Sequence, residues 1–138
     1  MNLLVIDGQG GQLGATVIKA VSERFPSVDI TAVGTNANAT AAMVKAGAKR
    51  AATGENPVVV TVKTADIIIG PIGIIIADSM LGEITPKMAQ AVGSADAVRI
   101  LIPMNKCENI IAGVSGYSVS YLVSDALNKL GGILENNA

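Results

Sequence analysis

Short apolar runs alternate along this chain with stretches of helical spacing. Residues 3–6 form a continuous apolar run of strand length, and a glycine-rich turn follows it. In residues 12–25 the apolar positions recur every three or four residues, which predicts a helix that ends at Pro26. The same alternation predicts further strands at residues 28–33, 50–53, 65–70 and 98–102, and further helices at residues 39–46, 86–92 and 118–130.

Helix boundaries follow from capping residues. Asn38 is expected to cap the helix at 39–46, Thr85 precedes a proline at the first helical position, and Ser118 opens the last helix. That last helix is expected to stop at the glycine pair 131–132.

Residues 57–64 are compatible with two structures. Their many β-branched side chains favour a strand. Asn56 followed by Pro57 is typical of a helix start, and a helix here continues the strand–helix rhythm into the next buried strand. We therefore expect a helix.

Strands that alternate with helices predict a mostly parallel sheet with helices on both faces. We expect a single Rossmann-like α/β domain over residues 1–138, doubly wound, with strand order 3-2-1-4-5. Residues 109–114 resemble a sixth strand, but too few residues separate them from the fifth for a crossover helix. This segment is therefore expected to pair antiparallel at the sheet edge.

Composition narrows the function classes. The 138 residues include no His and one Cys, which excludes a Ser–His–Asp triad, a His-ligated zinc site and an intrachain disulfide framework. The net charge of −1 argues against a nucleic-acid partner. No apolar run approaches the ~20 residues of a membrane helix, and the first residues lack a basic signal region, so we expect a cytoplasmic protein. The 50% hydrophobic content suggests a homodimer.

The strongest motif is the loop after the first strand, Asp-Gly-Gln-Gly-Gly-Gln-Leu-Gly at residues 7–14. Glycines let the backbone approach an anion, and the amides and dipole of the following helix point at it. No Gly-Lys-Ser/Thr follows, so a nucleoside triphosphate P-loop is excluded.

Ligands of such sheets bind outside the carboxyl ends of the strands. Polar and glycine residues gather at these ends, and they predict a site for a nucleotide or another phosphorylated molecule. The acid candidates for catalysis are Asp7 and Glu55, and no metal site is assigned. The candidate binding residues are Gly8, Gln9, Gly10, Gly11, Gln12, Gly14, Gly34, Thr35, Asn36, Thr53, Asn56, Gly70, Pro71, Gly73 and Asn105.

The loop Gly8–Gly14 resembles the opening of extended short-chain dehydrogenases, which implies NAD(P) as a cofactor. Two parts of that pattern are absent. The second strand ends in Gly-Thr-Asn at residues 34–36, without an acid for the ribose, and no Tyr-x-x-x-Lys occurs.

Over nearly its full length the chain resembles an uncharacterised family of short bacterial proteins. The strings at residues 5–11, 34–36, 52–56, 69–73 and 82–86 carry this resemblance, which implies a Rossmann-like fold without an assigned activity. Two functions follow as hypotheses. The first is a non-catalytic or regulatory module that binds a nucleotide or phosphorylated molecule. The second is a small NAD(P)-dependent enzyme whose site is completed across a homodimer.

Overall fold

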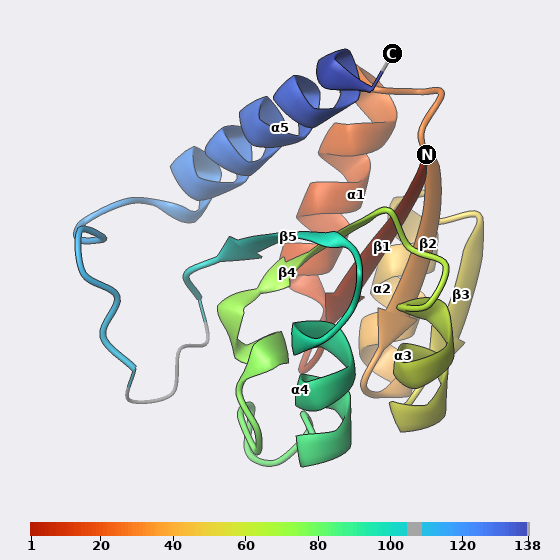
Figure 1. The fold of residues 1–138 in the computed structure, drawn as a ribbon, viewed down its shortest axis with the longest axis vertical. Coiled ribbons are helices and arrows are strands. Elements are labelled where there is room, and N and C mark those ends of the chain that lie inside the picture. The colour runs from red at the N-terminus through yellow and green to blue at the C-terminus, as the bar shows by residue number, and fades with distance from the viewer. Residues whose placement is uncertain (105–108, 138) are drawn as a thin grey trace.

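Five parallel strands form the centre of the protein in the order β3-β2-β1-β4-β5 (Figure 1). The computed structural model describes residues 1–104 and 109–137. The predicted strand order is confirmed. Two parallel neighbours need a crossover connection, and helices supply it here. The strands are β1 (Asn2–Asp7), β2 (Asp29–Gly34), β3 (Arg50–Thr53), β4 (Ile67–Pro71) and β5 (Val98–Ile102).

Helices cover both faces of the sheet (Figure 1). Strand β1 shows why both faces are apolar: Leu3 and Val5 pack toward one helix layer, and Leu4 and Ile6 toward the other. One layer contains α1 (Gln12–Arg24), α2 (Ala37–Ala46) and α5 (Val119–Asn136). The other contains α3 (Glu55–Thr61), α4 (Pro86–Gly93) and the short 3-10 helix η1 (Ile72–Ile75). In the described part of the chain, no helix is both long and apolar enough to cross a bilayer.

The prediction of an antiparallel edge strand is wrong. All four strand pairings are parallel, and residues 109–118 form no strand. The local reason is a turn, in which the amide of Val114 donates to the carbonyl of Ile111 at 3.2 Å. Gly113 within it has a φ of 81°, which lies outside the extended region of a strand. The fold is therefore an all-parallel five-stranded sheet.

The helix predictions hold with three changes at their ends. Residues 57–61 are helical rather than extended, but α3 begins two residues earlier than predicted, after Gly54 instead of Asn56, and residues 62–64 form a turn. Helix α2 is capped by Asn36 rather than Asn38, since the Asn36 side chain accepts from the amide of Ala39. Helix α5 continues through the glycine pair 131–132 to Asn136. Gly131 is buried there, where a Cβ would lie 3.2 Å from the ring of Phe25.

The Gly70 position in β4 provides a test of how closely β1 and β4 pack. A Cβ on Gly70 would lie 2.5 Å from the carbonyl oxygen of Ile6, which is backbone and cannot rotate away. We expect Gly70→Ala to lower the free energy of unfolding by at least about 2 kcal/mol, measured by urea denaturation. Gly93→Ala, at the end of α4 with open space around it, is the control and should be neutral or stabilise by about 0.5–1 kcal/mol. An unchanged urea midpoint for Gly70→Ala would contradict this account of the packing.

Candidate functional site

The carboxylate of Asp7 lies buried at the carboxyl end of β1. Its Oδ1 accepts a hydrogen bond from the amide of Gly8 at 2.8 Å, and its Oδ2 accepts one from the amide of Gly14 at 2.7 Å. Gly14 belongs to the first turn of α1, where unpaired amides and the helix dipole favour a negative charge. Asp7 itself therefore occupies part of the helix terminus that the glycine spacing predicts for a ligand phosphate.

Burial raises the pKa of Asp7, because poorly hydrated surroundings disfavour its charged form. The hydrogen bonds from Gly14 and Gly8 act in the opposite direction, and the negative charge of Glu83 adds to the rise. The net result is a carboxyl group that ionises less readily than an exposed aspartate. Any anion that binds beside it adds to this effect.

Close packing accounts for two of the loop glycines. Gly11 caps α1 with a φ of 72°, in the left-handed region that glycine tolerates. A Cβ at Gly11 would lie 2.7 Å from the Cα of Ala39, and one at Gly14 would lie 2.6 Å from the sulfur of Met43. Ala39 and Met43 both belong to α2. The approach of the loop and α1 to α2 therefore requires these glycines whether or not a ligand binds.

The side chain of Glu83 joins the first loop to the end of β2. Its Oε1 accepts three hydrogen bonds, from the amide of Gln9 at 2.9 Å, from Thr35 Oγ1 at 2.6 Å and from Asn36 Nδ2 at 2.8 Å. Asn36 Nδ2 also donates to the carbonyl of Gln9 at 2.9 Å, while its Oδ1 caps α2. The structure thus gathers Gln9, Thr35 and Asn36 around one anionic oxygen.

Glu83 belongs to a tight segment, residues 78–84, which we call the covering loop. Asp78, Met80 and Leu81 all have positive φ angles between 57° and 65°, a conformation that is uncommon for residues other than glycine. Met80 is buried, and a Cβ on Gly8 would lie 2.7 Å from its sulfur. Leu81 next to it is 99% exposed. The covering loop therefore packs directly on the start of the glycine loop.

Hydrogen bonding keeps Glu83 charged. Partial burial opposes ionisation, but the hydrogen bonds from Thr35, the Gln9 amide and Asn36 together outweigh it and hold the pKa of Glu83 below its usual range. Sequence reasoning missed Glu83 as a site residue, since its contacts lie 47 to 74 positions away in the chain. The one feature of the sequence that singled out Glu83 is its place in residues 82–86, a segment that carries the resemblance to the uncharacterised family.

The remaining candidates separate into two groups. Gly10 and Gln12 are exposed at the mouth of the glycine loop. The other candidates make no hydrogen bond with Glu83 among the contacts of the described residues. Gly34 packs against Thr40, whose hydroxyl also lies 2.7 Å from that of Thr53. Glu55 and Asn56 are exposed in the first turn of α3, and Gly70, Pro71 and Gly73 are buried in β4 and η1. Asn105 lies outside the described residues.

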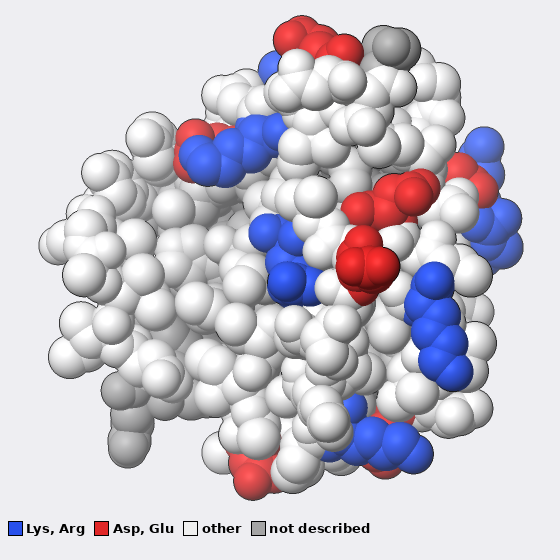
Figure 2. Space-filling view, viewed as in Figure 1, with Lys and Arg blue, Asp and Glu red and all other residues white. Residues whose placement is uncertain are grey.

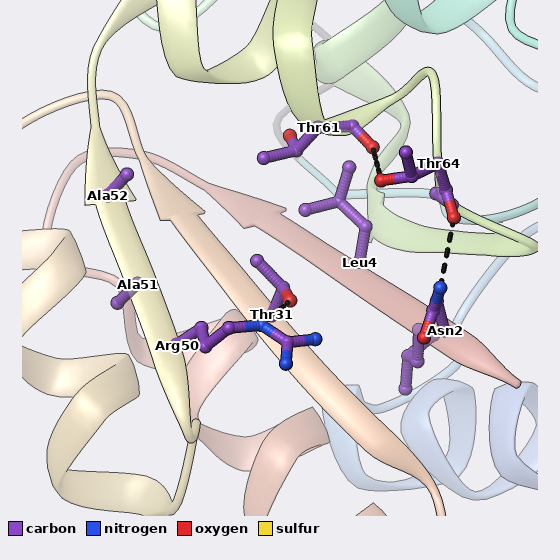
Figure 3. A pocket seen from close by; sticks show the side chains of 10 residues that line it. Asn2, Leu4, Thr31, Arg50, Ala51, Ala52, Thr61 and Thr64 are labelled. Carbon is purple, nitrogen blue, oxygen red and sulfur yellow. Dashed lines mark hydrogen bonds between the residues drawn. The ribbon is translucent and has the colours of Figure 1, made fainter.

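One hollow on the described surface contains none of the predicted site residues. A hollow of about 360 Å³ lies over β1, β2 and β3 beside α3, where Leu4, Arg50 and Thr61 face it (Figure 3). None of the candidate residues lines this hollow. Within residues 1–104 and 109–137, no group of three or more His, Cys, Asp and Glu side chains is arranged to hold a metal ion.

A family described as "Domain of unknown function (DUF3842)" matches residues 2–135. The chain belongs to this family. The resemblance to an uncharacterised family is thereby confirmed, and no curated protein matches the chain. Among solved structures, the chain is similar to a dodecameric FMN-dependent UbiX-like decarboxylase from Escherichia coli O157:H7. The two share 18% sequence identity over 95% of this chain and 76% of the other, with a TM-score of 0.46. This likeness assigns no function to the chain.

The hydrogen bonds of Glu83 predict a pH-dependent contribution to stability. Glu83→Gln keeps the shape but weakens three charge-assisted hydrogen bonds, and we expect it to lower the free energy of unfolding by about 1–2 kcal/mol at pH 7, allowing for partial solvent exposure. Because the folded pKa of Glu83 is lowered, this difference is present above the unfolded pKa of about 4.3 and disappears as pH falls through the folded pKa.

Urea denaturation of both proteins between pH 3 and pH 7 measures this difference. The comparison cancels most of the contribution of Asp7, whose raised pKa has the opposite sign and favours folding at low pH. Glu23→Gln, which removes an exposed negative charge on α1, controls for the change in net charge. A difference between wild type and Glu83→Gln that stays constant from pH 7 to pH 3 would contradict the proposed role of the ionised carboxylate.

Proposed function

We propose that the carboxyl edge of the sheet binds a nucleotide or another phosphorylated small molecule, as a non-catalytic or regulatory module. The supporting observation is the convergence of Gln9 N–H, Thr35 O–H and Asn36 N–H on the single anionic oxygen of Glu83. A backbone amide, a hydroxyl and a carboxamide are also the groups that hold phosphate oxygens in proteins. Glu83 Oε1 fills the position that such an oxygen would take.

Binding then exchanges one anionic oxygen for another. The ligand takes the three donors, and the side chain of Glu83 turns away from them. The exposed residues Gly10 and Gln12 lie at the start of α1, where further oxygens of the ligand are favoured by the helix dipole. The amides of Gly8 and Gly14 stay with Asp7, so these two glycines shape the loop rather than contact the ligand.

The alternative function, a small NAD(P)-dependent enzyme completed across a homodimer, receives less support from the geometry. Its two acid candidates lie apart: both oxygens of Asp7 are hydrogen-bonded within the loop, and Glu55 is exposed at the start of α3. A proton-transfer group must reach the reacting atoms of a substrate. The arrangement therefore favours binding over catalysis by these side chains.

Thermal unfolding in the presence of NAD(H), NADP(H), ATP, AMP, FMN and sugar phosphates tests the proposal. A ligand that binds only the folded chain stabilises it by about 2.7 kcal/mol at 100 times its Kd. Glu83→Ala removes the competing carboxylate, and we expect it to bind the same ligand about 5–30 times more tightly, the equivalent of about 1–2 kcal/mol.

Asn36→Asp is the matched variant that should abolish binding. The aspartate keeps an oxygen to cap α2 but replaces the donor to the anion by a repelling charge. Asn38→Asp places the same charge on an exposed position of the same helix turn and is the control. The proposal is wrong if no phosphorylated compound stabilises wild type or Glu83→Ala, or if Asn36→Asp and Asn38→Asp bind equally well.

A further inference from the structure

The backbone of Gln9 has a conformation that glycine adopts more readily than other residues. Its φ is 50°, in the left-handed region. The amide of Gly11 donates to the carbonyl of Gly8 at 2.9 Å, which closes a four-residue turn with Gln9 in its second position. Turns with a positive φ at this position usually contain Gly, Asn or Asp there. A glutamine is therefore an unfavourable residue for this turn on backbone grounds.

The next residue, Gly10, is a glycine that the backbone does not require. Its φ lies outside the left-handed region, and a Cβ there would meet only the side chain of Gln12, at 3.9 Å. The strained position of the turn thus carries a long polar side chain, while the neighbouring position carries none. A side chain that is present where the backbone disfavours it indicates a function for that side chain.

Hydrogen bonds hold the backbone of Gln9 on both sides. Its amide donates to Glu83 Oε1 at 2.9 Å, and its carbonyl accepts from Asn36 Nδ2 at 2.9 Å. Gln9 is exposed, however, and its side chain makes no hydrogen bond within residues 1–104 and 109–137. The contacts of the fold therefore fix the backbone of this residue and leave its carboxamide without a structural role.

The carboxamide of Gln9 lies within reach of a ligand bound at the three donors. The Gln9 amide is one of these donors, and its nitrogen is bonded to the Cα that carries the side chain, about 1.5 Å away. An anionic oxygen at the position of Glu83 Oε1, 2.9 Å from that nitrogen, therefore lies next to the start of the side chain. The rotatable bonds of glutamine allow its carboxamide to turn toward the groups attached to a phosphate there.

Hydrogen-bonding capacity indicates which group of a ligand the carboxamide fits. A carboxamide both donates and accepts, as a sugar hydroxyl does, whereas the oxygens of an ionised phosphate only accept. The surroundings also favour an uncharged group, since the carboxylates of Asp7 and Glu83 both bind amides of this loop. Figure 2 shows no compensating basic patch on the face in view, where Lys and Arg side chains are scattered among Asp and Glu.

We infer that the carboxamide of Gln9 recognises a hydroxyl of a sugar whose phosphate occupies the three donors. This inference rests on the proposed function, and it narrows the ligand class to phosphorylated sugars, nucleotides included, rather than a phosphate group alone. Gln9 then holds the phosphate through its amide and determines specificity through its side chain. This role accounts for a glutamine at a position where glycine is less strained.

Calorimetric titration of the full chain with AMP and with 2′,3′-dideoxy-AMP at pH 5 tests the inference. The two compounds share their base and their phosphate, which is mostly singly charged at this pH, and differ only in the ribose hydroxyls. We expect wild type to bind AMP about 5–30 times more tightly than the dideoxy compound, the effect of one or two hydrogen bonds. Gln9→Gly should bind the two compounds with equal affinity.

Two controls separate recognition from folding. Gln90→Ala removes the same carboxamide from an exposed position of α4 and should keep the preference for AMP. Gln9→Gly should keep or raise the urea midpoint, since glycine adopts the left-handed φ without strain. A lower midpoint overturns the inference, because the side chain would then have a structural role.

The inference is also overturned if AMP does not bind, if wild type binds both compounds equally, or if Gln9→Gly still prefers AMP. The proposed function survives these results if another phosphorylated compound stabilises the chain and Asn36→Asp abolishes that effect. Both fail together if no phosphorylated compound binds.

Discussion

The carboxylate of Glu83 is the contact on which the carboxyl edge of this protein depends. Three parts of the chain meet at its Oε1: the glycine loop through Gln9, the end of β2 through Thr35 and Asn36, and the covering loop itself. The covering loop also contributes the buried side chains of Met80 and Ile84 to the core. Without the shared oxygen, the amide of Gln9 and the two side chains would need water or a ligand as acceptor.

Asp7 and Glu83 divide the donors of the first loop between them. The buried carboxylate of Asp7 accepts hydrogen bonds from the amides of Gly8 and Gly14. The partly exposed carboxylate of Glu83 accepts one from the amide of Gln9. Burial makes the charge of Asp7 unfavourable, whereas hydrogen bonding makes that of Glu83 favourable. The two carboxylates therefore have different roles. Asp7 fixes the loop to α1, and under the proposed function Glu83 is the carboxylate that a ligand anion replaces.

The limits of prediction from this sequence have physical causes. Sheet order could be predicted because each apolar strand is followed by a helix that must cross over the sheet, and only a few topologies allow this. The strand predicted at residues 109–114 failed because an apolar composition does not report the turn that Ile111 and Val114 form. At residues 131–132, local glycine rules were outweighed by the tertiary contact of Gly131 with Phe25.

For the candidate site, too, some residues could be predicted from the sequence and one could not. Spacing along the chain placed Gln9, Thr35 and Asn36 at one edge of the sheet, and the structure has them within hydrogen-bonding distance of one oxygen. Spacing along the chain could not predict the position of Glu83. Its contacts depend on a covering loop in which several residues other than glycine have positive φ angles, a conformation that such residues rarely adopt.

Charge balance narrows the ligand class under the proposed function. Replacing Glu83 by a phosphodiester exchanges one negative charge for one, and the field at buried Asp7 changes little. A phosphate monoester in its dianionic form adds a second charge close to Asp7, whose pKa is already raised by burial and by Glu83. No lysine or arginine contacts the three donors to offset that charge among the hydrogen bonds of the described residues. Under the proposed function, singly charged phosphodiester groups therefore match this edge better than terminal monoesters do.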